Sequence, residues 1–194
     1  METANRIAFK EWAVICAALE SRGHIAILRK GGIQEGRQGF RVAYPEFWLF
    51  PTYQHQNIPG LVDEARPLLD EVAARRPPEA TIRLEHYAVV RKVGYLTDPS
   101  QLKALEGHHL WSQSTIQQRF DYREPGLFML LVRVYKIPRA LEFDSSPYFD
   151  GCRSWVELPE PLATDGCRPV LADDEFARRE QALAAALKSV DWQH

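Results

Sequence analysis

The segment Leu127–Ile137, LFMLLVRVYKI, is the strongest strand pattern in this chain. A run this rich in apolar and β-branched residues is typical of a strand in the buried centre of a sheet. The rest of the chain therefore has to be arranged around a sheet that contains this strand.

The remaining segments do not alternate regularly between strand and helix. Apolar residues at helical spacing, together with capping residues, predict helices at 7–21, 67–76, 98 onward, 112–120 and from 173. Extended patterns predict strands at 24–29, 46–50 and 81–96, and the proline-rich stretch 138–172 predicts an irregular wrap over the surface. This order favours an α+β fold. We expect a mixed or mainly antiparallel twisted sheet, barrel-like in its most closed form, flanked by helices and with a C-terminal helix appended.

A chain of 194 residues is long enough for one domain. We predict an α+β core over residues 1–158, followed by an irregular, acidic extension and an amphipathic helix over residues 159–194. The apolar stripe of that helix has to be buried, either within the same domain or against a second copy in a homodimer. The stripe consists of Phe176, Leu183, Ala184 and Leu187.

The net charge of −2 hides an uneven distribution of charge along the chain. Residues 1–143 carry 19 Lys and Arg against 16 Asp and Glu, whereas residues 144–194 carry 5 against 10. The body is therefore mildly basic, which neither excludes nor establishes a phosphate-rich partner.

Two further features bear on the compartment. No apolar run approaches the ~20 residues that span a membrane, and residues 1–10 lack the apolar segment of a signal peptide. The cysteine count is odd, at three, which is typical of a reducing environment. We therefore expect a cytoplasmic protein with no membrane partner.

The first polar motif, LRKGGIQE, spans residues 28–35. Its paired glycines let the backbone approach a ligand closely, with Arg29 and Lys30 as cations and Glu35 within reach. The motif lacks the spacing of a phosphate-binding P-loop and of GxGxxG, so a simple hairpin turn is the alternative.

The second motif, EFWLFPTYQHQ, spans residues 46–56 and places polar side chains after an aromatic strand. The rings of Trp48 and Tyr53 can stack on a base, and Gln56 can hydrogen-bond its edge. His55 has a side chain suited to a general base at neutral pH. The alternatives are a core strand for the aromatic residues and a structural role for His55.

The third set of candidates lies between residues 108 and 133. His109 and Trp111 belong to the motif HHLWS, and Arg119 follows on a predicted helix, where it can meet a phosphate. Arg133 interrupts the apolar strand, so it is either a site residue or paired with a carboxylate such as Glu85, Glu46 or Glu157. No metal-binding motif accompanies these residues, and we expect neither a metal nor a cofactor.

Five segments together are similar to one known family: LRKGGI-x-E, FWLFPTYQHQ, HHLWS, LLVRVYKIP and GCRSWVEL, at 28–35, 47–56, 108–112, 130–138 and 151–158. On these motifs the chain resembles the DUF1802 family over about residues 10–158. The resemblance implies a bacterial, single-domain protein. Because the family has no assigned activity, the resemblance implies no catalytic residues.

Our leading hypothesis is a module that binds or processes nucleic acid or a nucleotide through a basic and aromatic pocket. In this hypothesis Lys30, Glu35, His55 and Gln56 converge on one pocket rimmed by aromatic side chains. The proposed ligand-binding residues are Arg29, Trp48, Tyr53, Gln56, His109, Trp111, Arg119 and Arg133. The alternatives are a hydrolase acting on a small phosphorylated ligand, with His55, Glu35 and Lys30 as catalytic residues, or a non-catalytic interaction or regulatory protein.

Overall fold

The body of the protein is one curved sheet in the computed structural model, which describes residues 1–30, 44–54, 56, 58–151, 153–188, 190 and 192–193. The strand order is β2-β5-β4-β3-β1-β6, with β7 paired to β5 and β8 paired to β4. Strand β1 runs parallel to β3, and every other pairing among the described strands is antiparallel. The strands are β1 (Ala4–Trp12), β2 (Ala26–Arg29), β3 (Glu46–Thr52), β4 (Thr81–Leu96), β5 (Leu127–Asp144), β6 (Trp155–Ala163), β7 (Arg168–Pro169) and β8 (Trp192–Gln193).

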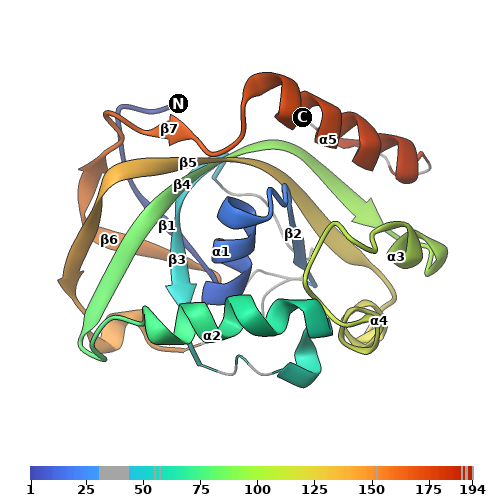
Figure 1. The fold of residues 1–194 in the computed structure, drawn as a ribbon, viewed down its shortest axis with the longest axis horizontal. Coiled ribbons are helices and arrows are strands. Elements are labelled where there is room, and N and C mark those ends of the chain that lie inside the picture. Colours follow the sequence, from blue (N-terminus) through green and yellow to red (C-terminus); the bar gives the residue numbers. More distant parts are fainter. Residues whose placement is uncertain are drawn as a thin grey trace.

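Strand β5 is the longest described strand, and it is buried over most of Leu127–Val134 as the sequence predicted, but it lies second from one end of the strand order and not at its centre. It pairs with β4 from Leu127 to Asp144 and with β2 along Phe128–Leu131. Two register shifts interrupt the β4–β5 ladder, and such irregularities increase the local twist and bend of paired strands. Figure 1 shows the two long strands arching over helix α1 (Ala13–Ser21).

The described residues form five α-helices, of which α1 lies inside the curve of the sheet and the other four lie around it. Helices α2 (Arg66–Ala74), α3 (Ser100–Ala104), α4 (Gln113–Asp121) and α5 (Asp173–Ala186) lie where the sequence predicted helices. Ser112 caps α4, because its Oγ accepts a hydrogen bond from the backbone N–H of Thr115 at 3.3 Å. The single turns η1 (Ile58–Gly60), η2 (Asp63–Ala65) and η3 (Pro147–Phe149) complete the architecture, and the α+β prediction is confirmed.

The first predicted helix was wrong in its N-terminal half. Residues 7–12 belong to β1, and the helix begins only at Ala13. Strand β1 is buried on both faces from Ala8 to Glu11, because Phe9 packs in a core cluster that includes α1 and Ala8 packs in a second core cluster. A strand that is apolar on both faces does not alternate, so its pattern merges with that of the following helix. The helix ends at the predicted position, where Gly23 adopts a φ of +64°.

The segment 138–172 was also predicted incorrectly as irregular throughout. Strand β5 continues past Pro138 to Asp144, and β6 and β7 follow. Strand β6 lies at the edge of the sheet, where it pairs with β1 alone among the described strands. Prolines are tolerated in such a strand, because the position without an N–H donor can face away from the neighbouring strand.

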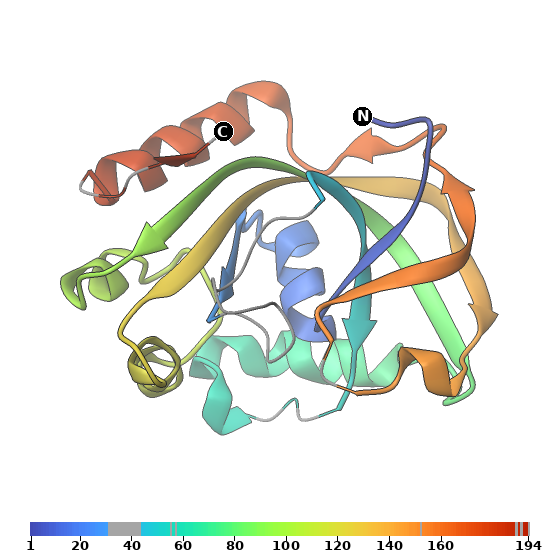
Figure 2. The same cartoon turned by 180° about the vertical axis from the view of Figure 1, so that it is seen from behind.

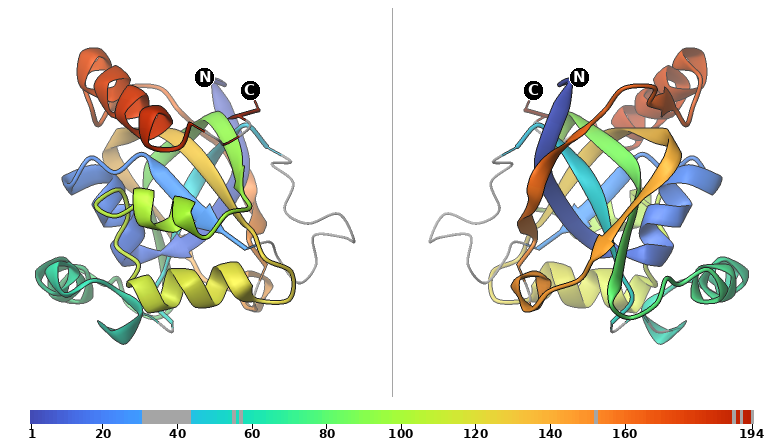
Figure 3. Two further views of the ribbon diagram at one scale, coloured as in Figure 1. Left: turned by 90° about the vertical axis from the view of Figure 1, so that its right-hand side faces the viewer. Right: turned by 90° about the vertical axis from the view of Figure 1, so that its left-hand side faces the viewer.

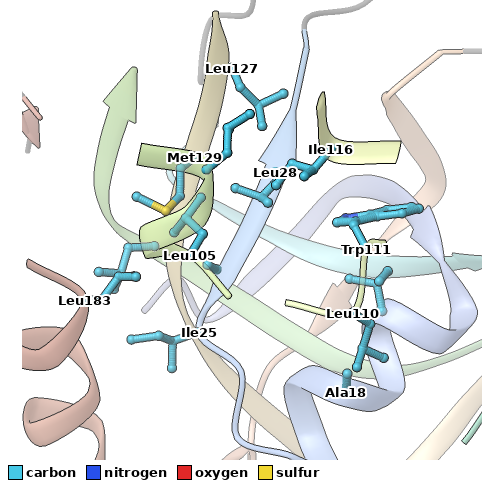
Figure 4. Packing of buried hydrophobic residues seen from close by; sticks show 14 of the residues in the cluster. Ala18, Ile25, Leu28, Leu105, Leu110, Trp111, Ile116, Leu127, Met129 and Leu183 are labelled. Atoms are coloured by element: carbon cyan, nitrogen blue, oxygen red, sulfur yellow. The ribbon is translucent and has the colours of Figure 1, made fainter. Parts of the chain in front are cut away.

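Helix α5 buries the predicted apolar stripe within its own chain. Phe176, Leu183 and Leu187 are almost fully buried, and they join the core cluster that contains residues of β2, β5 and the α3–α4 region. Figure 4 shows Leu183 directed toward Ile25 and Leu105 in this cluster. The chain itself therefore covers the stripe, so its burial does not require a second copy. A homodimer through α5 stays a prediction.

Figures 2 and 3 show how the helices are distributed around the sheet. Helix α1 lies inside the curve of the sheet, α2 lies beside it at the open side, and α5 lies across the outer end near β4. Of the described helices, including the 14-residue α5, none combines the length and the apolar character needed to cross a membrane.

The burial of β5 and its pairing on both sides predict a large effect of Leu130→Ala on stability. Leu130 is fully buried between β2 and β4, so its truncation should lower the free energy of unfolding by about 2–5 kcal/mol. The control Arg139→Ala, at an exposed position of the same strand, should change it by less than about 0.5 kcal/mol. Urea denaturation of both variants measures the difference, and equal midpoints would contradict the burial of Leu130 in the core.

Candidate functional site

Both ends of α1 carry a carboxylate that interacts with two basic side chains. The helix itself is apolar and lies against β1, β3, β5 and α2. Glu11 lies just before its first residue, and Glu20 lies in its last turn. Charges in such buried surroundings have to be compensated, because an isolated ion loses its hydration. The two ends are therefore the places where polar chemistry concentrates.

Glu11 is the more deeply buried of the two carboxylates, with 3% of its surface exposed. Its Oε1 accepts a hydrogen bond from the backbone N–H of Trp12 at 2.8 Å. Its Oε2 accepts no hydrogen bond within the described residues and lies 3.9 Å from a guanidinium nitrogen of Arg29. Arg29, the last residue of β2, also packs over the ring of Phe9.

Arg119 of α4 is the second guanidinium near Glu11. It stacks on Trp111 with 3.6 Å between the guanidinium carbon and the ring centroid, and Trp111 packs against Trp12 at 4.7 Å. Burial lowers the pKa of Arg119, attraction to Glu11 raises it, and repulsion from Arg29 lowers it. Two guanidinium groups therefore share one carboxylate, which leaves an excess of positive charge.

Gln56 joins this cluster from the loop after β3. Its side-chain oxygen accepts a hydrogen bond from the backbone N–H of Val14, in the first turn of α1, at 2.9 Å. We name the group formed by Glu11, Arg29, Gln56, Trp111 and Arg119 the arginine–tryptophan cluster. Four of its members were predicted as ligand-binding residues. Glu11 was missed, because a charged residue inside an apparent helix suggests only an exposed position.

Lys30 does not belong to a phosphate site in this structure. Its Nζ donates hydrogen bonds to the carbonyl oxygens of Phe120 and Gly126, each at 2.8 Å, and also to that of Glu124. A cation at the carbonyl end of a helix stabilises that end, and here it fixes the turn after α4. The prediction that Lys30 is free for ligand chemistry is therefore wrong.

The aromatic rim predicted from the second motif is not assembled. Trp48 is fully buried in the core, and its Nε1 donates to the carbonyl of Asn5 at 2.9 Å. Tyr53 packs under the guanidinium of Arg76, with the ring centroid 5.3 Å away. Glu35 and His55 lie outside the described residues. The other proposed members do not form the predicted single pocket.

Arg133 is paired, but with a different partner from those predicted. Its guanidinium forms an ion pair with Asp173 at the start of α5 and lies 5.0 Å from the ring centroid of Phe176. None of the three predicted glutamates is this partner. The pair joins β5 to α5, which assigns Arg133 a structural role rather than a ligand-binding one.

His109 is a buried histidine in the turn between α3 and α4. Its Nδ1 accepts a hydrogen bond from the backbone N–H of Trp111 at 3.1 Å, and its Nε2 has no hydrogen-bond partner in the described part of the chain. Burial, followed by the nearby His24 and His108, lowers the pKa of His109 to about 4. It is therefore neutral at pH 7, and it supports the backbone of the cluster through Trp111.

Glu20, at the other end of α1, was not singled out from the sequence. Its Oε2 lies 2.9 Å from Nε2 of His86 on β4, and its Oε1 pairs with Lys136 on β5. The hydrogen bond from His86 and that from Lys136 lower the pKa of Glu20 to about 2 against the opposing effect of burial. The partners are 66 and 116 residues away, so no local motif could have indicated this trio.

Metal binding receives no support from these clusters. Over the described ranges, no group of three or more His, Cys, Asp or Glu side chains is arranged to hold an ion.

Comparison with known proteins identifies one family. The family model DUF1802, described as a domain of unknown function, matches residues 8–182. The match extends past residue 158, where the sequence motifs ended, and includes β6, β7 and much of α5. No curated protein and no solved structure matches the chain.

The buried state of His109 predicts that acid destabilises the protein. Because its pKa is about 4 in the folded state and ~6.5 in the unfolded state, the unfolded chain binds the proton first as the pH falls below 6.5. Stability should therefore drop by up to about 2 kcal/mol per such histidine between pH 7.5 and pH 5. Chemical denaturation across this range measures the effect.

His109→Asn is the matched variant, because an asparagine oxygen can still accept the hydrogen bond from Trp111. It should flatten the pH dependence, whereas His108→Asn, at a less buried position, should flatten it less. An unchanged pH dependence in His109→Asn would show that His109 is not the titrating group.

Proposed function

The chain belongs to the DUF1802 family, and we propose that it binds a phosphate-bearing ligand, either a nucleotide or a nucleic-acid strand, at the arginine–tryptophan cluster. The family description assigns no activity, so the proposal rests on the site alone. The observation that carries it is the gathering of two guanidinium groups around the single carboxylate of Glu11: Arg29 pairs with it at 3.9 Å, and Arg119, stacked on Trp111, is attracted to it electrostatically.

Guanidinium groups suit this ligand for a geometric reason. The planar fork of an arginine can donate two parallel hydrogen bonds to phosphate oxygens, and it stays charged even when partly buried. Stacking on Trp111 holds the plane of Arg119, so little side-chain freedom is lost on binding. A phosphate would supply the second negative charge that the two arginines lack.

The aromatic residues take a different role from the one the sequence suggested. Trp111 is only 2% exposed and is covered by Arg119, so it orients the guanidinium instead of stacking on a base. The ligand is thus recognised mainly through its phosphate. Nucleotides and nucleic acids are the abundant ligands of this class in a bacterial cytoplasm, where we place the protein.

The hydrolase alternative gains nothing from the described residues. Lys30 is bound to carbonyl oxygens, and the other two proposed catalytic residues, Glu35 and His55, lie outside the described part of the chain. We therefore propose binding and no chemical step.

Two variants of the cluster should change binding in opposite directions. Arg119→Gln removes a charge-assisted contact of about 1.5–3 kcal/mol, so affinity should fall about 10- to 100-fold. Glu11→Gln removes the internal competitor for both arginines while keeping its size, so affinity should rise. The measurement is fluorescence anisotropy with labelled single- and double-stranded nucleic acids and a labelled ATP analogue, at two salt concentrations.

Arg178→Gln is the charge-matched control, because Arg178 is an exposed residue of α5 that pairs with carboxylates of its own helix. It should leave the affinity close to that of the wild type. Absence of salt-sensitive binding, or an equal loss in Arg178→Gln and Arg119→Gln, would overturn the proposal.

A further inference from the structure

A cavity of about 880 Å³ lies at the end of α1 opposite to the arginine–tryptophan cluster. It is bounded by α1, by α2, by the Lys136–Pro138 segment of β5 and by residues 166 and 168–170 around β7. Figure 1 shows α1 and α2 side by side beneath the arch of β5. Its volume is in the range of cavities that hold small molecules.

Much of the wall of this cavity is apolar. Leu68 and Val72 face it from α2, Ala17 from α1, and Ile137 and Val170 from the opposite side. Leu68 and Ile137 are each 7% exposed, so the wall continues into the core and does not form an isolated surface patch. Such a wall favours a ligand with an apolar body.

The carboxylate of Glu20 contributes little negative field to the cavity. Lys136 and His86 each interact with one of its two oxygens. The positive charge of Lys136 already cancels the negative charge of Glu20. The second carboxylate of the lining is Glu71 on α2. Against these two acidic groups the lining carries three cations, so one positive charge remains.

The excess charge belongs to Arg75 and Arg168, which are exposed at the mouth of the cavity. Within the described ranges, neither forms an ion pair with a carboxylate of the protein. They approach the cavity from different elements, Arg75 from the end of α2 and Arg168 from β7. A ligand head group between them would meet two guanidinium groups, whose combined charge exceeds that of Glu71 by one.

We propose that this cavity binds an amphipathic monoanion, namely an aliphatic carboxylate whose head group pairs with Arg75 and Arg168. Its hydrocarbon chain lies on the wall formed by Leu68, Val72 and Ile137. A single negative charge matches the single excess positive charge of the lining. This site shares no residue with the arginine–tryptophan cluster, so it is independent of the function proposed above.

Isothermal titration of the full chain with decanoate tests the proposal. Decanoate should bind, whereas acetate, which has no apolar body, and decyltrimethylammonium, which has the opposite charge, should bind at least about 10-fold more weakly. Arg75→Ala and Arg168→Ala should each weaken decanoate binding about 2- to 5-fold, the range expected for partly exposed ion pairs. The double variant should weaken it about 10-fold.

Two further variants control for position and for fold. Arg76→Ala removes the same charge one residue further along, where the side chain packs over Tyr53, and it should leave decanoate affinity unchanged. Val72→Phe narrows the cavity with an apolar ring at a half-buried position on the wall proposed for the hydrocarbon chain, so it should weaken decanoate binding in a folded protein. Circular dichroism confirms that each variant is folded.

Four results would overturn the proposal. They are an absence of decanoate binding, equal binding of decanoate and decyltrimethylammonium, an equal effect of Arg76→Ala and Arg75→Ala, and full binding by Val72→Phe. Nucleic-acid and nucleotide binding by the Arg75 and Arg168 variants is measured in parallel. A loss there but not with decanoate would assign the phosphate ligand to this cavity instead of to the cluster.

Discussion

The pairing of β4 with β5 is the interaction on which the rest of the structure depends. The ladder runs the length of both strands, and its two register shifts accompany the bend that lets the sheet curve. The curve creates an interior, and α1 occupies it with six of its nine residues buried. Without that concave face, neither the apolar helix α1 nor strand β1, which is buried on both of its faces, could be covered.

The burial of α1 explains why charged groups gather at its ends. Its middle can contain only apolar residues, so the two flanking carboxylates mark where the interior meets polar surroundings. Glu11 is compensated by Arg29 and Arg119, and Glu20 by His86 and Lys136. The group around Glu11 retains an excess of positive charge. The charges of Glu20 and Lys136 cancel, and these two side chains line a cavity. The two proposed sites thus follow from one structural requirement.

The helices and strands that were predicted correctly are those whose sequence signals lie close together along the chain. Helix α4 was predicted correctly because its cap, Ser112, and its apolar face lie within ten residues. Strand β1 was mistaken for a helix because both of its faces are buried, and the residues that cover each face come from distant parts of the chain. Lys30 looked like a ligand-binding cation, yet it is bound to three carbonyl oxygens that no sequence pattern could connect to it.

The sequence by itself determined that the chain is an α+β protein and that Leu127–Ile137 forms a largely buried strand, because apolar periodicity and capping act over a few residues. It also identified Arg29, Gln56, Trp111 and Arg119 as candidates through their residue types. Only the tertiary structure decided that these four gather around the start of α1, where Arg29 pairs with Glu11. It also decided that Arg133 pairs with Asp173 and that Glu20 joins His86 and Lys136. Charge compensation in a buried setting depends on distance in space, and the partners come from strands and helices far apart along the chain.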